Sequence, residues 1–190
     1  MTEKEALRLR ARKIAESMTG RERAENSAAI RDRVLALEAY RQARTVFLFV
    51  SMPLEPDTAA LISRALADGK RVCVPRCEKP PRMEAAAIRS RKELLSGRLG
   101  IPAPGPEAEA VPPQEIDLAL IPCVAAGRDG SRLGHGGGYY DAFLPETRAK
   151  KICLCFDSLV FPSLPMEDTD VWMDRVVTES RTIWRGEKTK

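Results

Sequence analysis

The hexapeptide TVFLFV, residues 45–50, decides the fold class, because its β-branched, apolar and aromatic side chains follow one another with no charged residue between them. A run that does not alternate between apolar and polar residues is typical of a strand buried on both faces of a sheet. Three later segments have the same character: RVCVP (71–75), DLALI (117–121) and KICLCF (151–156). We therefore predict four buried strands in one sheet, with weaker strands over 84–88 and 175–177.

Two helices are predicted before the first strand. At Thr2 and again at Thr19 a glutamate follows three positions later, which is the spacing of a capping box. The pattern predicts helices over 3–17 and 20–39.

Helices are also predicted between the strands. Asp57 or Thr58 begins one that Gly69 ends, and YYDAFL (139–144) begins another. Strands that alternate with helices predict an α/β fold: a mainly parallel sheet with helices on both faces, in a Rossmann-like three-layer sandwich. Such a sheet places its ligands beyond the carboxyl ends of its strands.

The 190 residues fit a single domain, 1–190, with basic N-terminal helices at 1–44 and an α/β core at 45–190. The segment 96–114 is dense in proline and glycine and is predicted to be a surface connection. No apolar run approaches the roughly 20 residues that a membrane helix needs. We expect no membrane association.

The first residues are charged and lack the apolar stretch of a secretory signal, and three early glutamates argue against a transit peptide. Five cysteines without a CxxC pair are typical of reduced thiols in a cytoplasmic protein. His135 is the only histidine, which excludes a metal site made of several histidines.

The net charge of +4 is concentrated at the N-terminus, because residues 1–44 hold 11 Lys/Arg against 7 Asp/Glu and the remainder is balanced. One interpretation is two solvated basic helices, and the other is a surface for an anion, either a nucleic acid or a polyphosphate. A nucleic-acid surface favours aromatic side chains among the basic ones. The segment contains only Tyr40, so we expect no nucleic-acid partner.

The segment RLGHGGG (132–138), called the glycine loop below, has the composition of a phosphate-binding loop. Glycines without Cβ atoms let backbone N–H groups approach an anion, and a helix is predicted to begin directly afterwards. Arg132 supplies a cation. The spacing matches neither GxxxxGK[ST] nor a GxGxxG next to a strand, and the alternative is a merely flexible loop.

Four more side chains are candidates for the same chemistry. Lys4 and Arg8 lie four residues apart and share one helix face that suits a triphosphate, although a solvated face fits equally. Glu55 lies between two prolines after the first strand and suits an amino-bearing heterocycle, or is a plain surface acid. Asp141 and Asp170 are candidate magnesium ligands, with a solvated or capping acid as the alternative, and Asp168 competes with Asp170.

These segments occur together in one order. IDLALIPCVAAGRDGSRLGHGGGYYDAFL (116–144) strongly resembles the characteristic sequence of the 5-formyltetrahydrofolate cyclo-ligase (5,10-methenyltetrahydrofolate synthetase) family. The resemblance extends to Lys4 and Arg8, to SMPLEPDT (51–58), to GKRVCVP (69–75) and to DTDVWMDRVVTE (168–179). It covers nearly the whole chain and is weakest over 76–114.

The resemblance implies a role for each site residue. ATP would be bound by the first helix and the glycine loop with the residues after it: Lys4, Arg8, Arg132, Leu133, Gly134, His135, Gly136, Gly137, Gly138, Tyr139 and Tyr140. Of these, Arg132 and Tyr140 would be catalytic. Many family members have a lysine where this chain has Gly137, and often an aromatic residue near the position of Leu99.

The implied reaction is the ATP-dependent cyclisation of 5-formyltetrahydrofolate by a monomer with Mg²⁺. Val50 and Glu55 would line the folate site, and Asp141 and Asp170 would support the metal. The formyl oxygen on N5 would attack the γ-phosphate, N10 would add to the activated carbon, and phosphate would leave. Such chemistry requires mainly positioning and charge stabilisation. A second interpretation keeps the fold without this activity, as a paralogue that binds another nucleotide or pterin-like ligand.

Overall fold

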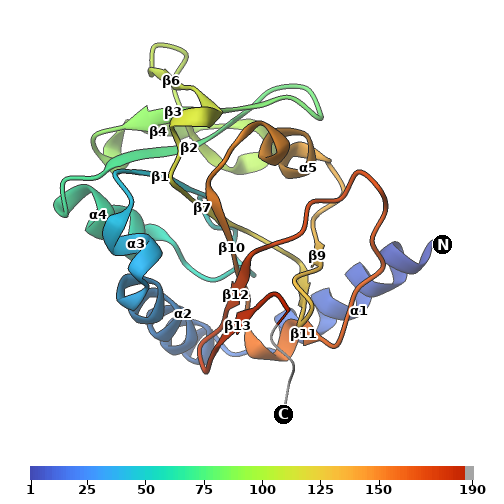
Figure 1. The fold of residues 1–190 in the computed structure, drawn as a ribbon. Helices are drawn as coiled ribbons and strands as arrows, with labels where there is room; N and C mark the ends of the chain where they lie inside the picture. Colours follow the sequence, from blue (N-terminus) through green and yellow to red (C-terminus); the bar gives the residue numbers. More distant parts are fainter. Residues whose placement is uncertain (187–190) are drawn as a thin grey trace.

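The computed structural model describes residues 1–186, which fold around one eight-stranded sheet (Figure 1). Five neighbouring strands run parallel: β2 (Arg71–Cys77), β1 (Thr45–Leu48), β7 (Leu118–Ile121), β10 (Lys150–Leu154) and β12 (Arg175–Val177). Antiparallel strands complete the edges: β3 (Met83–Ile88) and β6 (Ala110–Val111) beside β2, and β13 (Thr182–Trp184) beside β12. The mainly parallel sheet is confirmed.

Helices cover both faces of this sheet, as the sequence predicts. In Figure 1, α2 (Gly20–Ala36), α3 (Glu38–Gln42) and α4 (Ala59–Ala67) lie on one side and α5 (Tyr139–Phe143) lies on the other. Helix α1 (Glu3–Ser17) runs beside the small strand β11, where Arg10 stacks on Phe161. The α/β sandwich is therefore confirmed. None of the helices in the described part of the chain is long and apolar enough to cross a membrane.

The centre of the sheet is the core, because its strands are buried on both faces. Every residue of β1 and β7 is buried, and Phe47 stacks on Phe143 of α5 with ring centroids 5.1 Å apart. All five cysteines are free thiols, and only Cys77 among them is not fully buried. The continuous apolar runs in the sequence thus correspond to strands that are buried on both faces.

Local signals place most helix ends correctly. Both predicted capping boxes are present, at Thr2 and Thr19. The helix predicted over 20–39 ends at Ala36, because Leu37 is extended and begins the short α3. At the start of α4, Thr58 is the N-cap residue without a side-chain cap hydrogen bond, and the preceding Asp57 accepts a hydrogen bond from the N–H of Ala59.

Short elements that the sequence pattern does not reveal complete the fold. A second sheet is made of β8 (Ala125–Gly127), β9 (Arg132–Leu133) and β11 (Val160–Phe161), and a hairpin is made of β4 (Leu94–Ser96) and β5 (Pro102–Pro104). Single 3₁₀ turns are η1 (Arg91–Glu93), η2 (Arg98–Gly100), η3 (Pro113–Glu115), η4 (Leu144–Glu146) and η5 (Asp157–Leu159). The predicted surface connection 96–114 therefore contains the end of β4 and the whole of β5 and β6. Proline is tolerated in such strands because they are short and lie at sheet edges.

The strand order fixes where a ligand site forms. The parallel strands lie in the order β2-β1-β7-β10-β12, so the chain moves from β1 to one side and later returns to β7 on the other side. Connections that leave two neighbouring strands in opposite directions open a crevice at their carboxyl ends. The segment after β1 and the segment after β7, which contains the glycine loop, both begin at this crevice.

Candidate active site

The segments that follow β1 and β7 meet through one polar contact. His135 of the glycine loop lies with Nε2 2.9 Å from Oε1 of Glu55, although the two residues are 80 positions apart. Glu55 is buried, with only 6% of its side chain exposed, whereas 51% of the His135 side chain is exposed. The crevice between β1 and β7 therefore brings the predicted folate residue to the predicted phosphate loop.

Glu55 is held rigidly on its other side. Its Oε2 accepts a hydrogen bond of 2.8 Å from the N–H of Met52, and its own N–H donates to the carbonyl of Met52. Thr58 donates to the carbonyl of Phe49 and so ties the end of this segment to the strand. The carboxylate is thus fixed in a buried turn, and the interpretation as a plain surface acid is wrong.

Arg132 lies beneath the glycine loop and is almost wholly buried, with 2% of its side chain exposed. Its Nη2 donates to Oδ1 of Asp141 at 2.8 Å, and its Nη1 donates to the carbonyl of Pro122 at 3.4 Å. The guanidinium also lies over the ring of Tyr140, 5.6 Å from the centroid. Its Nε has no hydrogen-bond partner among the described residues. A buried cation is therefore fixed directly under the loop.

Tyr140 is packed between the core and this cation. Burial raises the pKa of its hydroxyl well above the usual 10.0, and the charge of Glu55 adds to this effect, while Arg132 opposes it. The phenol is therefore neutral at physiological pH. It can donate a hydrogen bond and does not act as a general base.

The backbone of the glycine loop needs glycine at defined positions. Gly136 and Gly138 have positive φ values of 94° and 69°, in the left-handed region that glycine adopts without strain. A Cβ on Gly134 would lie 2.9 Å from Nη1 of Arg132. Gly134 can therefore lie over the guanidinium only because it has no side chain. This close fit disfavours the interpretation as a merely flexible loop.

The helix that follows the loop contributes less than its sequence position suggests. Helix α5 has five residues, and Gly138 caps it without a side-chain hydrogen bond. A helix dipole is the sum of aligned peptide units, so such a short helix has a weak positive end. The positive charge around the loop comes from arginine side chains instead.

The N-terminal helix supplies the second of these arginines. Nε of Arg8 donates to the carbonyl of Gly134 at 2.8 Å. Nζ of Lys4 bonds to Oδ2 of Asp170 at 2.5 Å and lies 3.2 Å from Oε1 of Glu167. Both predicted cations of α1 therefore lie at the site, and the interpretation of this face as merely solvated is wrong for Lys4 and Arg8.

The predicted cations and the predicted metal ligands are paired with each other in this structure. Arg132 bonds to Asp141 and Lys4 bonds to Asp170. Burial works to raise the pKa of Asp170, but the hydrogen bonds from Lys4 and from the N–H of Glu167 outweigh it and leave the pKa lowered. Burial likewise works to lower the pKa of Lys4, but the two acids outweigh it and leave the pKa raised. Both groups are therefore charged at neutral pH.

The two candidate metal ligands lie close together through the backbone. Oδ1 of Asp141 accepts a hydrogen bond from the N–H of Val171, the residue next to Asp170. Within residues 1–186, no group of three or more His, Cys, Asp or Glu side chains forms a complete metal site. Two carboxylates suit Mg²⁺, which usually keeps several waters and takes its remaining ligands from substrate phosphates.

Other predicted residues lie at the margin of this cluster. Val50 follows β1 and is half-buried against the core, and Leu133 is buried in β9. Tyr139 turns its hydroxyl toward the β2–β3 hairpin and donates to the carbonyl of Glu78 at 3.0 Å. The side chain of Leu99 lies outside the described residues.

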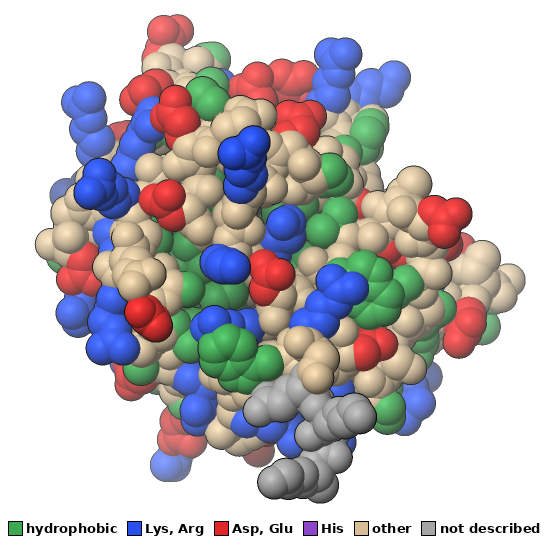
Figure 2. Space-filling view, viewed as in Figure 1, with side chains coloured by type: hydrophobic (Ala, Val, Ile, Leu, Met, Phe, Trp, Pro, Cys, Tyr) green, Lys and Arg blue, Asp and Glu red, His purple; other side chains and the backbone are tan. Residues whose placement is uncertain are grey.

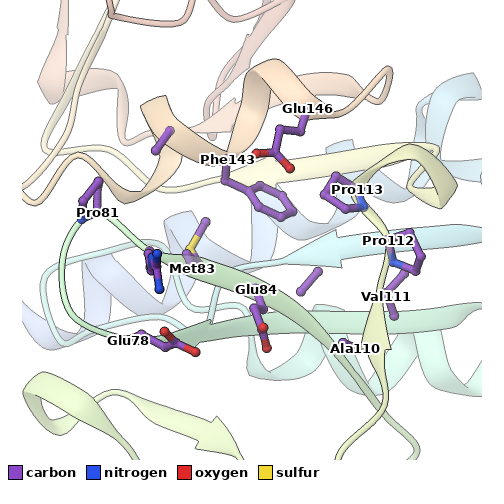
Figure 3. A pocket seen from close by; sticks show the side chains of 13 residues that line it. Glu78, Pro81, Met83, Glu84, Ala110, Val111, Pro112, Pro113, Phe143 and Glu146 are labelled. Atoms are coloured by element: carbon purple, nitrogen blue, oxygen red, sulfur yellow. The ribbon is translucent and has the colours of Figure 1, made fainter.

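The sequence pattern misses one partner in the cluster and one groove beside it. Glu167 contacts Lys4 and has no motif or spacing that points to it. A groove of about 550 Å³ lies between α5 and the β3–β6 edge, with Met83, Val111 and Phe143 in its wall (Figure 3). No residue of the predicted site lines this groove.

Some basic side chains of the N-terminal segment are accompanied by acidic ones. On the face drawn in Figure 2, Lys and Arg side chains are interspersed with Asp and Glu. Several arginines of this segment pair with acids one turn away, as Arg12 does with Glu16 and Arg21 does with Glu25.

Comparisons with known proteins agree on one family. Residues 1–179 match the 5-formyltetrahydrofolate cyclo-ligase family. A probable 5-formyltetrahydrofolate cyclo-ligase of Schizosaccharomyces pombe is 32% identical over 174 residues, which cover 83% of this chain and 85% of that protein. The 5-formyltetrahydrofolate cyclo-ligase of Escherichia coli K12 is 32% identical over 148 residues, or 75% of this chain and 81% of that protein.

The fold has the same relatives. The structure of 5,10-methenyltetrahydrofolate synthetase from Aquifex aeolicus matches with a TM-score of 0.88 and 26% sequence identity, over 100% of this chain and 96% of that one. The family match over residues 1–179 and the similarity to these relatives together show the family of the chain. The chain belongs to the 5-formyltetrahydrofolate cyclo-ligase family, a family of ligases that use ATP to cyclise 5-formyltetrahydrofolate.

Proposed function

We propose that this protein performs the reaction of its family with the residue cluster at the β1–β7 crevice. The reaction converts 5-formyltetrahydrofolate to 5,10-methenyltetrahydrofolate and ATP to ADP and phosphate. The contact between Glu55 and His135 carries the proposal, because it joins a buried acid suited to a pterin to a loop suited to phosphates. Two substrates that must react with each other need sites that touch.

The phosphates of ATP are proposed to lie along the glycine loop. Arg8 and Arg132 both lie against Gly134, which supports this assignment. Lys4 lies one helical turn from Arg8 on α1 and would reach the same phosphates. Arginine and lysine at these positions neutralise the charge that develops on the transferred phosphoryl group.

The pterin ring is proposed to bind at Glu55, with Val50 beside it. A buried carboxylate accepts hydrogen bonds from the amino and ring N–H groups of a pterin, and such charge-assisted bonds fix the orientation of the ring. Tyr140 is affected by the charges of both this acid and Arg132, which shift the pKa of its hydroxyl in opposite directions. We assign Tyr140 to orient the formyl oxygen that attacks the γ-phosphate, and Arg132 to stabilise the phosphoryl group.

After phosphorylation of the formyl oxygen, N10 of the folate is proposed to add to the activated carbon, and phosphate leaves. Neither Cys123 nor Cys153 is a ready thiolate nucleophile. The hydrogen bond with Cys153 works to lower the pKa of Cys123, but the hydrogen bond with Cys155 and burial leave it well above 9.0. Burial raises the pKa of Cys153 well above 9.0. The protein therefore acts by positioning and charge stabilisation rather than by covalent catalysis.

Asp141 and Asp170 are proposed to hold Mg²⁺ together with the phosphates. When bound, Mg²⁺ would neutralise phosphate charge during transfer. The carboxylates would exchange their present partners, Arg132 and Lys4, for the metal, and the two cations would turn to the phosphates.

We further propose a cytoplasmic monomer without nucleic-acid or membrane partners. The contacts of Arg8 with Gly134, Glu55 with His135 and Lys4 with Asp170 assemble the proposed site within the chain, so the proposal requires no residue from a second copy. Free thiols at all five cysteines support a reducing compartment. A relative from Arabidopsis thaliana, 29% identical over 209 residues, is a mitochondrial 5-formyltetrahydrofolate cyclo-ligase, so location varies among related proteins.

The purified protein with 5-formyltetrahydrofolate and Mg-ATP is expected to produce the absorbance of the methenyl product, with one ADP released per product formed. Omission of ATP serves as the control, and removal of Mg²⁺ with a chelator should abolish turnover. A protein that binds both substrates without forming the methenyl product would instead be a paralogue that has kept the fold and lost the activity.

A further inference from the structure

Among the described residues, the only side chain that contacts the Glu55 carboxylate oxygen Oε1 is His135 of the glycine loop. Oε2 is fixed by the N–H of Met52 within its own turn, whereas Oε1 contacts Nε2 of His135. A carboxylate only accepts hydrogen bonds, so the imidazole is the donor in this contact. The orientation of the Glu55 carboxylate therefore depends on one contact within its own segment and one contact with the glycine loop.

The position of His135 is in turn set by residues assigned to the nucleotide. Its neighbour Gly134 accepts the hydrogen bond from Arg8 and lies over the guanidinium of Arg132. On the other side, a Cβ on Gly136 would lie 3.6 Å from the guanidinium carbon of Arg8. His135 is thus held between two glycines whose backbone lies against the proposed phosphate-binding cations.

We propose that His135 is a positioning residue that makes the affinity for folate depend on nucleotide in the glycine loop. Phosphates that bind the loop and its arginines favour one loop arrangement, and that arrangement holds the imidazole on Glu55. A ligand that favours one arrangement raises the affinity of any second ligand that needs it, and the effect is reciprocal. The inference rests on the proposed function, in which Glu55 binds the pterin and the loop binds ATP.

The surroundings of His135 make the inference testable without damage to the core. About half of its side chain is exposed, and its ring makes no other side-chain hydrogen bond within the described residues. Glutamine at this position keeps a side-chain N–H donor, whereas alanine removes it. Arg128 lies in the same connection between β7 and α5 with an exposed side chain and provides a matched control.

The test is calorimetric titration of 5-formyltetrahydrofolate with and without saturating Mg-AMP-PNP, a nucleotide whose γ-phosphate is not transferred. In the wild type the nucleotide is expected to tighten folate binding about tenfold, within the range usual for coupled sites. The ratio should fall to about one in His135→Ala, recover in His135→Gln and stay at the wild-type value in Arg128→Ala. The folate alone should tighten AMP-PNP binding by the same factor.

The inference would be overturned if His135→Ala showed the same ratio of folate affinities, with and without the nucleotide, as the wild type. It would also be overturned if the nucleotide did not change the folate affinity of the wild type. Circular dichroism and thermal unfolding of each variant show that altered ratios come from folded protein. A wild type that binds no folate in either condition would overturn the proposed function itself. The two failures are therefore distinct, because only the second removes the binding of a single ligand.

Discussion

At the scale of single residues, the site is built from charges that neutralise each other. Arg132 is buried against Asp141, and Lys4 is half-buried against Asp170. An unpaired buried charge is costly, so such cations need acids beside them. The acids that we assign to the metal thus also stabilise these cations. The sequence shows the residue types, but not that they pair.

Replacement of Arg132 is expected to damage both catalysis and stability. Arg132→Ala removes a cation from the proposed phosphoryl site, and loss of one such donor typically lowers kcat about 10²- to 10³-fold. It also strips the partner from a mostly buried carboxylate, at a cost of about 1–3 kcal/mol in the free energy of unfolding. Steady-state kinetics and urea unfolding measure the two effects.

The exposed Arg128→Ala provides the control for a lost arginine in the same connection. Arg132→Lys should recover part of the stability but little of the rate, because an ammonium cannot match the planar fork of a guanidinium. Wild-type kinetics in folded Arg132→Ala would remove this residue from the catalytic assignment.

At the scale of elements, helix α1 is attached both by an apolar face and by polar side chains that reach the site. Ala11 and Ala15 are buried, and partly buried neighbours such as Leu7 pack against the core. Lys4 bonds to Asp170 in the segment before β12, and Arg8 bonds to Gly134 directly after β9. A helix attached in this way responds to ionisation, because its contacts at one end are an ion pair and charge-assisted hydrogen bonds.

The attachment of α1 is expected to weaken in acid and to persist at moderately alkaline pH. The pKa of Asp170 is lowered from its usual 3.8, so its stabilising contribution is present above that value and is lost as the pH falls through the lower folded value. The pKa of Lys4 is raised from 10.5, so its contribution is present below that value and is lost only at still higher pH. Hydrogen exchange at the first turns of α1, corrected for intrinsic rates and compared with α2, measures the attachment.

The variant Lys4→Gln should exchange rapidly at neutral pH and show no further acid transition in α1. Lys13→Gln removes a lysine from an exposed position of the same helix and should behave like the wild type. Equal protection of α1 in the wild type at pH 2.5 and pH 7 would contradict a role for this ion pair.

Prediction from sequence succeeds for elements that carry their signal locally. Buried strands, capping boxes and the glycine loop are all visible in short segments, because each depends on neighbouring side chains. Strands β8 and β9 are missed because they have two or three residues in a glycine-rich segment, and because β8 pairs both with β9 and with β11, which lies about 35 residues further along the chain. The contact of Glu55 with His135 is equally invisible, since only the strand order brings them together.

At the scale of the whole molecule, helix α1 near the N-terminus and the segment before β12 both contribute residues to the proposed site. Lys4 bonds to Asp170, which lies 166 residues further along the chain, and Arg8 reaches the glycine loop from the same helix. The net charge of the chain, which resides in its first 44 residues, is thus placed partly beside the proposed phosphates. Elsewhere on α1, Arg12 pairs with Glu16 and Arg10 stacks on Phe161, whereas Lys4 and Arg8 contact residues of the proposed site.

Deletion of residues 1–9 is therefore expected to leave a folded protein that binds 5-formyltetrahydrofolate but has lost most of its affinity for Mg-ATP. The buried residues of α1, Ala11 and Ala15, remain, and of the side chains that pack against the core only the partly buried Leu7 is removed, so the core should persist. Binding of a fluorescent ATP analogue at matched salt measures the loss. The double variant Arg12→Gln with Lys13→Gln removes two charges from exposed positions and should bind as the wild type does. Because the deletion removes Glu3 and Glu5 together with Lys4 and Arg8, it leaves the net side-chain charge unchanged, whereas the double variant lowers it by two. A drop in affinity confined to the double variant would mean that only the general field of the basic segment matters. Unchanged affinity after the deletion would mean that the first turns of α1 take no part in nucleotide binding.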